Sequence, residues 1–178
     1  MLSIDTLNKN VLLKASALDT AILTSANFSI IATDEEGVIQ LFNVGAQHLL
    51  GYTADEVVNR MRPTDLTDPA EAMRHASALS AELKVAIAPG FEALTYKASR
   101  GLEDVFETTC ICKNGARLPM VVSITALYEP QGQAIGYLVI GTDNSLRKRA
   151  EEELTQAMQA VEAASSAKSE FISRMSHE

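Results

Sequence analysis

The sequence predicts an α+β domain over residues 26–145, in which five antiparallel strands form one sheet with helices on one face. A separate helix is expected at each end of the chain. Two observations support this fold class. Short apolar runs with strand character fall into two groups, a pair before and three after a stretch with helical periodicity. Turn signals join neighbouring runs, and the apolar spacing near both ends of the chain is helical.

The first 25 residues have the apolar pattern of an amphipathic helix. Apolar side chains recur every three or four positions, at Ile4, Leu7, Val11, Ala15, Leu18 and Ile22. A helix with one apolar stripe must bury that stripe against another surface. We therefore expect residues 1–25 to form a dimerising helix.

A hairpin and two short helical segments follow. Residues 28–33 and 38–43 are apolar runs separated by the polar, Gly-ended segment 34–37, which predicts two strands joined by a turn. The spacing then becomes helical. Residues 46–51 predict a short helix closed by a glycine, and residues 54–60 predict one or two further turns.

A longer helix is predicted over residues 69–84 from the residues at its start. Asp68 is a candidate N-cap, Pro69 suits the first helical position, and Glu71 stands where a capping-box glutamate would. A Pro-Gly dipeptide then breaks the helix. A further helical piece is expected over residues 91–101, ending at a C-capping glycine.

Three more strands complete the expected sheet. They are predicted over residues 105–113, 117–128 and 135–141. Asn114 and Gly115 form the strongest short hairpin signal in the chain, and a Pro-Gln-Gly turn joins the last two strands. The predicted order is therefore two strands, three helical segments and three strands.

From residue 146 onward the sequence predicts a coiled-coil helix. One seam with heptad spacing runs through Leu154, Met158, Val161, Ser165, Lys168, Ile172 and Met175. A second seam through Ala157, Ala164 and Phe171 is almost as good, so the register of the coiled coil stays open. A helix of this kind pairs with a second copy, and we expect a homodimer through the terminal helices.

Composition and charge exclude several classes of function. The chain has 15 Lys and Arg against 23 Asp and Glu, a net charge of −8, which disfavours nucleic-acid binding. No apolar stretch reaches the roughly 18 residues of a membrane helix, and no signal peptide is recognisable. We therefore expect a cytoplasmic segment without membrane contact. Cys110 and Cys112 alone provide neither a disulfide framework nor a four-ligand metal site.

Several motifs resemble those of PAS domains. The family's helical signature is similar to Asn-Val-Gly-Ala at 43–46, Leu-Leu-Gly-Tyr at 49–52 and Glu-Val at 56–57. The central hairpin of the family is similar to Lys-Asn-Gly at 113–115 and Ser-Ile-Thr at 123–125. The resemblance covers about residues 25–145.

This resemblance implies a PAS fold with a sheet in spatial order 2-1-5-4-3 and a ligand-sized pocket between the sheet and the helices. Asp143 and Ser145 stand at the family's signal junction between the last strand and the output helix. The Asp matches the family, whereas the next two residues differ from its usual Ile-Thr. Ser145 can still cap the helix.

The last twelve residues resemble the opening of a histidine-kinase phosphoacceptor box. In that family a histidine ring nitrogen attacks the γ-phosphate of ATP, and a neighbouring carboxylate assists removal of the proton. By this resemblance the catalytic residues are His177 and Glu178. The family's pattern continues beyond Glu178, and the chain has no Gly-rich phosphate loop. We therefore expect a part of a longer kinase, inactive alone, whose parent uses ATP and a response regulator.

Candidate pocket residues follow from the predicted elements and their apolar character. They are Ile30, Phe42, Leu50, Val57, Met61, Phe91, Leu94, Cys110, Cys112, Met120, Val122 and Ile140. Polar side chains that could orient a ligand are Gln40, Thr95, Tyr96, Arg100 and Ser123. Most of the apolar residues are expected only to fill the core.

The histidine and cysteine positions limit the cofactor chemistry. The flavin adduct of light-sensing relatives needs a cysteine among the helices after the second strand, and no Cys precedes Cys110, so that chemistry is excluded. Haem-binding relatives commonly use a histidine late on the long helix. His75 lies earlier, beside Arg74, and is expected on the solvated face, while His48 is expected on the surface. His-ligated haem is therefore not favoured, and the ligand stays unknown.

The combined interpretation is a sensory PAS module of a two-component histidine kinase. A small molecule or protein partner at the sheet would regulate ATP-dependent autophosphorylation of His177 through the coiled-coil output helix. The alternative is a ligandless PAS module for protein–protein interaction. A third output, such as a cyclase, is disfavoured by the Ser-His-Glu ending.

Overall fold

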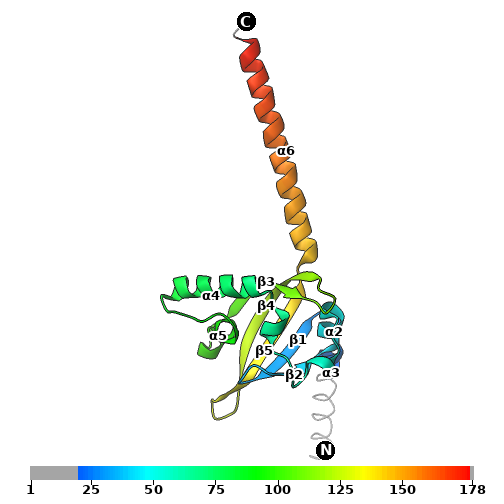
Figure 1. Cartoon of the computed structure of the whole chain (residues 1–178), viewed down its shortest axis with the longest axis vertical. Coiled ribbons are helices and arrows are strands. Elements are labelled where there is room, and N and C mark those ends of the chain that lie inside the picture. Colours follow the sequence, from blue (N-terminus) through cyan, green and yellow to red (C-terminus); the bar gives the residue numbers. More distant parts are fainter. Residues whose placement is uncertain (1–19, 177–178) are drawn as a thin grey trace, which may run out of the picture. The chain divides into compact units, whose positions relative to one another are not determined.

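The computed structural model describes residues 20–176, and the expected helix over residues 1–25 lies largely outside them, with residues 20–24 helical. The chain divides into two compact units, one ending at Asp143 and the other beginning at Asn144 (Figure 1). The first unit contains β1 (Ser29–Asp34), β2 (Ile39–Phe42), α2 (Val44–Leu50), α3 (Ala54–Val57), the 3-10 turn η1 (Pro63–Leu66), α4 (Pro69–Leu83), α5 (Phe91–Thr95), the 3-10 turn η2 (Ala98–Arg100), β3 (Asp104–Ile111), β4 (Arg117–Tyr128) and β5 (Ala134–Asp143). The second unit contains α6 (Ser145–Met175).

The strands form one antiparallel sheet in the order β2-β1-β5-β4-β3, which confirms the predicted fold and strand order. The last strand, β5, lies in the middle and is hydrogen-bonded to β1 on one side and β4 on the other. Because β5 ends at Asp143 and α6 begins at Ser145, the central strand leads almost directly into the C-terminal helix.

Asn43 fixes the start of α2. Its side-chain oxygen accepts hydrogen bonds from the backbone N–H groups of Ala46 (2.8 Å) and Ile30 (2.9 Å). Its amide nitrogen lies 3.0 Å from the carbonyl oxygens of Ser25 and Phe28. One buried side chain therefore caps α2 and ties it to the segment that leads into β1.

The predicted helix over residues 54–60 stops early, at Val57. Val58 is extended and Asn59 has a φ of 58°. The backbone then pairs with β2: Asn59 N donates to the Ile39 carbonyl, and Ile39 N donates to the Met61 carbonyl. Asn59 N therefore bonds to β2 rather than to the carbonyl four residues earlier, where a continuing helix would need it.

The start of α4 confirms one predicted cap and corrects another. The Asp68 side chain accepts hydrogen bonds from the N–H groups of Ala70 and Glu71, as expected for an N-cap. Glu71 does not complete a capping box, since its carboxylate lies 2.6 Å from the Arg74 guanidinium instead.

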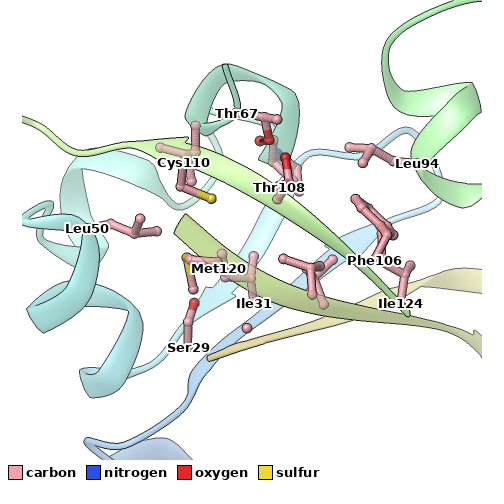
Figure 2. Close-up of a pocket in the computed structure, with 15 residues that line it drawn as sticks. Ser29, Ile31, Leu50, Thr67, Leu94, Phe106, Thr108, Cys110, Met120 and Ile124 are labelled. Atoms are coloured by element: carbon pink, nitrogen blue, oxygen red, sulfur yellow. Dashed lines mark hydrogen bonds between the residues drawn. The ribbon is translucent and has the colours of Figure 1, made fainter. Parts of the chain in front are cut away.

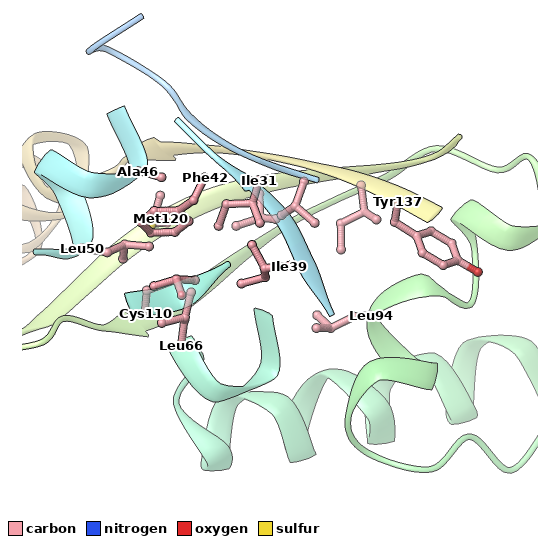
Figure 3. Packing of buried hydrophobic residues seen from close by; sticks show 14 of the residues in the cluster. Ile31, Ile39, Phe42, Ala46, Leu50, Leu66, Leu94, Cys110, Met120 and Tyr137 are labelled. Carbon is pink, nitrogen blue, oxygen red and sulfur yellow. The ribbon is translucent and has the colours of Figure 1, made fainter. Parts of the chain in front are cut away.

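The main core lies between the sheet and the helices (Figure 3). Ile31, Phe42, Cys110 and Met120 reach it from the strands, and Ala46, Leu50, Leu66 and Leu94 reach it from α2, η1 and α5. A smaller cluster of Ala76, Leu79, Ile87 and Ala93 packs α4 against α5 and the loop between them. The first unit therefore has its helices against one face of the sheet, as predicted.

The second unit is a single helix, α6, of 31 residues, and none of its described side chains is buried. Its N-cap position is Asn144, so Ser145 is the first helical residue rather than the expected cap. Among the helices of residues 20–176, none combines the length and apolar character that crossing a bilayer requires.

Candidate functional site

A cavity of about 40 Å³ lies between the inner face of the sheet and the helices (Figure 2). Its wall is mostly apolar and is formed by Ser29, Ile31, Leu50, Pro63, Leu66, Thr67, Leu94, Phe106, Thr108, Cys110, Met120, Val122, Ile124, Val139 and Gly141. The strands β1, β3, β4 and β5 provide one side, and α2, η1 and α5 provide the other. The site is therefore the interior of the first unit.

The short segment η1 covers one side of the cavity, and the residues that follow it are tied to β3. Thr67 and Cys110 form an antiparallel bridge, and the N–H of Asp68 donates to the Thr109 carbonyl at 2.9 Å. The Thr67 hydroxyl donates to the Pro63 carbonyl, also at 2.9 Å, and so satisfies its own donor within η1. These bonds hold the wall residues Pro63 and Leu66 over the sheet.

Cys110 on β3 and Cys112 just past its end lie in different surroundings. Burial raises the pKa of the Cys110 thiol to about 12, so this cavity residue stays protonated at neutral pH. Cys112 is half-buried, and its Sγ lies 3.4 Å from the Leu49 carbonyl oxygen. Burial also raises the pKa of Cys112. Neither thiol has the depressed pKa of a reactive cysteine.

The volume of the cavity limits the size of the molecule that it can bind without a change in its wall. About 40 Å³ accommodates water-sized molecules, whereas sites for drug-sized ligands have roughly 300–1,000 Å³. A larger ligand would need the wall to move. The most adaptable wall side chain is Met120, because Met has three rotatable bonds. Its Cε occupies the space left by Gly141, 2.5 Å from where a Cβ would stand.

Five of the predicted pocket residues line this cavity, namely Leu50, Leu94, Cys110, Met120 and Val122. Phe42 and Val57 are buried in the same core, with Met61 and Phe91 packed against it, but these four do not reach the cavity wall. None of the polar candidates Gln40, Thr95, Tyr96, Arg100 and Ser123 lines it either.

The expected places of three candidates need correction. Ile30 and Ile140 are register partners on β1 and β5, and they lie on the opposite face of the sheet from the cavity. Successive strand residues alternate between faces, so the inward positions are their neighbours Ile31 and Val139. Cys112 lies past the end of β3, beside the surface of α2 rather than in the cavity.

Ten wall residues were not among the candidates. Strand alternation could have found several of them, because Cys110 on β3 points inward and therefore Thr108 and Phe106 do as well. Pro63, Leu66 and Thr67 carry no such periodicity. The position of this segment in the cavity wall depends on tertiary hydrogen bonds to β3, which the local sequence does not predict.

The two histidines of the first unit have different environments. His48 is exposed on α2, as predicted. The expectation that His75 lies on the solvated face of α4 is wrong. Its ring is stacked on Phe106 of β3, with centroids 4.0 Å apart, and its Nε2 faces the buried Asp104 carboxylate. The catalytic candidates His177 and Glu178 lie outside the described residues.

The described part of the chain offers no metal centre, because nowhere in it do three His, Cys, Asp or Glu side chains gather.

The helix α6 carries a series of exposed apolar residues. They are Leu154, Met158, Val161, Phe171, Ile172 and Met175, and each is more than half exposed in the single chain.

Comparison with known proteins agrees with the geometry. The PAS fold profile matches residues 18–143. The cell-division control histidine kinase PdhS of Brucella anthropi is 29% identical over 159 residues, which cover 88% of this chain and 13% of that protein. The PdhS protein of Brucella ovis gives the same identity, with 14% of its length covered. The chain therefore spans about one-eighth of the length of the curated relatives that it matches.

Solved structures show the same fold at low sequence identity. A PAS domain from Colwellia psychrerythraea has a TM-score of 0.54 at 20% identity, covering 74% of this chain and 96% of the other. A sensory box histidine kinase/response regulator structure from Burkholderia thailandensis has a TM-score of 0.54 at 16% identity, covering 81% and 96%. The chain belongs to the PAS family and is distantly related to sensor histidine kinases.

Proposed function

We propose that this chain is the sensory and dimerisation module of a two-component histidine kinase. In this proposal it regulates ATP-dependent autophosphorylation of His177 through its C-terminal helix. The observation that carries the proposal is α6, a 31-residue helix whose heptad-spaced apolar side chains remain exposed in a single chain. Exposed apolar residues in a heptad pattern are stabilised by pairing with a second helix, here one from a second copy of the chain.

Two pairings of α6 are close in composition. In this proposal the second seam is completed by residues of the first. The shared residues are then Leu154, Val161, Lys168 and Met175. The seams differ in their flanks, which are Met158, Ser165 and Ile172 in one and Ala157, Ala164 and Phe171 in the other. Successive residues are about 103° apart at 3.5 residues per turn, so exchanging the flanks rotates each helix by about 50°. A rotation of this size changes where a residue near the end of the helix points.

The sheet has a short route to this helix. Met120, the adaptable residue of the cavity wall, is the register partner of Asp143 at the end of β5. Only Asn144 separates Asp143 from the first residue of α6. In the proposed mechanism a change in the wall at Met120 displaces the end of β5, which favours one of the two pairings.

The phosphotransfer chemistry rests on the resemblance of the last residues to a phosphoacceptor box. A ring nitrogen of His177 attacks the γ-phosphorus of ATP, ADP leaves, and Glu178 assists removal of the ring proton. The ATP-binding part and the response regulator that receives the phosphoryl group belong to the longer parent protein and its partner.

Two measurements test this proposal. Sedimentation equilibrium of the 178-residue chain should show a dimer, and Val161→Glu should weaken it because that substitution places a carboxylate in both seams. Glu162→Gln, next to the seam, is the matched control and should leave the dimer intact. In the longer protein, radiolabelled ATP should label the wild type but not His177→Gln. A monomer at every concentration, or labelling that survives His177→Gln, would refute it.

The small cavity favours a second candidate, a PAS module without a small-molecule ligand that acts by protein–protein interaction. At about 40 Å³ the cavity is nearly filled by its own side chains. Absorption spectroscopy and mass spectrometry of the purified, then denatured, chain distinguish the two. Release of a stoichiometric organic molecule would rule out the ligandless module, and its repeated absence would favour it.

A further inference from the structure

His75 and Asp104 form a buried polar pair between α4 and β3, beside the cavity. The His75 ring lies on the ring of Phe106 with an angle of 24° between their planes. His75 Nε2 is 3.9 Å from Asp104 Oδ2, which is too long for a hydrogen bond. The side chains are 17% and 4% exposed, respectively. Neither of these two atoms has a hydrogen-bond partner.

The other ring nitrogen determines which tautomer is present. The backbone of Ala93 acts on the His75 ring in the sense that raises the histidine pKa, which is the effect of a carbonyl oxygen beside a ring N–H. Because Nε2 has no partner, the donor is Nδ1. A neutral imidazole has a single N–H, which leaves a lone pair on Nε2 facing the carboxylate. Two acceptors then face each other, out of contact with water.

Two further charged groups face this pair. Lys97, which follows α5, is ion-paired with Glu82 of α4 at 3.2 Å. Burial is the largest influence: it lowers the pKa of His75 and raises the pKa of Asp104. The Asp104 charge raises the His75 pKa, whereas Lys97 lowers the pKa of both members and Glu82 raises them.

We propose that His75 and Asp104 together form a proton-binding site, which takes up one proton from solvent as the pH falls and closes into a hydrogen bond. The proton binds to Nε2, the Nδ1–H bond to Ala93 is kept, and the imidazolium donates to the Asp104 carboxylate. Charge-assisted N–H···O bonds are about 2.8 Å long. The present distance of 3.9 Å would therefore shorten by about 1 Å, which draws α4 towards β3.

This closure reaches the cavity through β3. Asp104, Phe106 and Thr108 are every second residue of β3 and therefore lie on the same face of the strand. Phe106 and Thr108 line the cavity. Because the His75 ring is stacked on Phe106, a shift of α4 against β3 changes the cavity wall directly. The first unit would then respond to a proton without binding a larger molecule. This inference needs neither the dimer nor the kinase activity proposed above.

The test is an NMR titration of the histidine rings in the full 178-residue chain. Signals of the three histidines are assigned with His48→Gln and His177→Gln. At high pH, Nε2 of His75 should be unprotonated and Nδ1 protonated. Its protonation midpoint should lie below the ordinary histidine range, and the Phe106 ring signals should shift with the same midpoint. A His75 ring with the opposite tautomer, or Phe106 signals that do not follow the titration, would overturn the proposal.

A substitution separates the pair from simple burial. Asp104→Asn removes the carboxylate charge that favours the imidazolium, so the His75 midpoint should fall further. The ring signals of the exposed His48 serve as the internal control and should be the same in the variant and the wild type. An unchanged His75 midpoint in Asp104→Asn would show that the two groups do not share the proton. If that variant does not fold, the tautomer and the Phe106 response of the wild type decide the question.

Discussion

At the scale of single residues, the PAS-like motif at 43–46 has a physical explanation. Asn43 makes hydrogen bonds through both ends of its amide and joins the segment before β1, β1 itself and α2. Gly45 lies so close to Phe28 that an added Cβ would be 2.0 Å from its carbonyl oxygen. The two residues therefore fix how α2 seats against the start of the sheet.

Replacement of Asn43 by alanine should cost about 3 kcal/mol in the free energy of unfolding. It removes the N-cap of α2 and leaves partly buried backbone groups of Ile30, Ser25 and Phe28 without the bonds that Asn43 makes to them. Asn114→Ala is the control, since Asn114 is exposed and bonds only within its turn; it should cost less than about 1 kcal/mol. Urea unfolding of both variants gives the comparison, and equal losses would contradict the role given to Asn43.

The Glu56–Lys113 ion pair should make the stability of the protein depend on pH in the acidic range. The hydrogen bond from Lys113, followed by that from the Thr53 backbone, lowers the pKa of Glu56 from 4.5 to about 2. A carboxyl group with a lowered native pKa contributes stability above its ordinary pKa, and this contribution is lost as the pH falls from 4.5 towards 2. Lys113→Gln should therefore raise the Glu56 pKa, which NMR of the carboxyl carbon measures.

The Lys113 variant should not restore the ordinary pKa entirely, because Thr53 still donates to Glu56 through its N–H at 2.9 Å. Lys84→Gln removes a lysine from the end of α4 and serves as the charge-matched control. A Glu56 midpoint that moves as much in Lys84→Gln as in Lys113→Gln would mean that net charge, rather than the ion pair, sets the pKa.

Residue-level prediction from the sequence works where local chemistry decides the structure. Asp68 caps α4 as expected because its carboxylate needs only the next N–H groups along the chain. The side chains of Ile30, Ile140 and His75 were misplaced because their orientation depends on which neighbours they meet. A one-residue error in strand phase moves a side chain to the other face, and His75 is buried only because α4 lies against β3.

At the scale of elements, the contact between α2 and the chain before β1 should be sensitive to a single methyl group. Gly45→Ala would place a Cβ against the backbone of Phe28, which cannot rotate away, so a loss of about 3 kcal/mol is expected. Gly115→Ala is the control for the strain of a positive φ alone, since it has a φ of 82° and open space around it; it should cost about 1 kcal/mol. Thermal unfolding compares them, and a smaller loss for Gly45→Ala would contradict the close contact.

The order of elements was predictable because strong turn and cap signals separate them. Gly51 adopts the left-handed conformation at the end of α2, and Gly115 does so in the hairpin between β3 and β4. The segment 58–67 was the weakest part of the prediction. There the backbone pairs with Ile39 of β2 and then with β3, and these long-range bonds end α3 and create η1.

At the scale of the whole molecule, a sensor needs a responsive interior and a route out of it. The interior here is a nearly filled cavity whose wall includes Met120 and Phe106. Met120 pairs with the end of β5, and Phe106 contacts His75. The proposed signalling route through Met120 and the proposed proton-binding site at His75 therefore both involve residues of the cavity wall. The two proposals are tested by separate experiments.

The two seams of α6 predict a competition that single substitutions should bias. Ser165→Leu strengthens the seam that includes Met158, and Ala164→Leu strengthens the one that includes Ala157. Disulfide formation between copies reports the choice: Met158→Cys should cross-link more in the Ser165→Leu background, and Ala157→Cys more in the Ala164→Leu background. Cross-linking of the chain without an added cysteine gives the background level of disulfides formed by Cys110 and Cys112. That background should be low because burial raises the pKa of both thiols. Cross-linking yields that are the same in all backgrounds would mean that α6 has one fixed pairing, and rotation between seams could not then carry the signal.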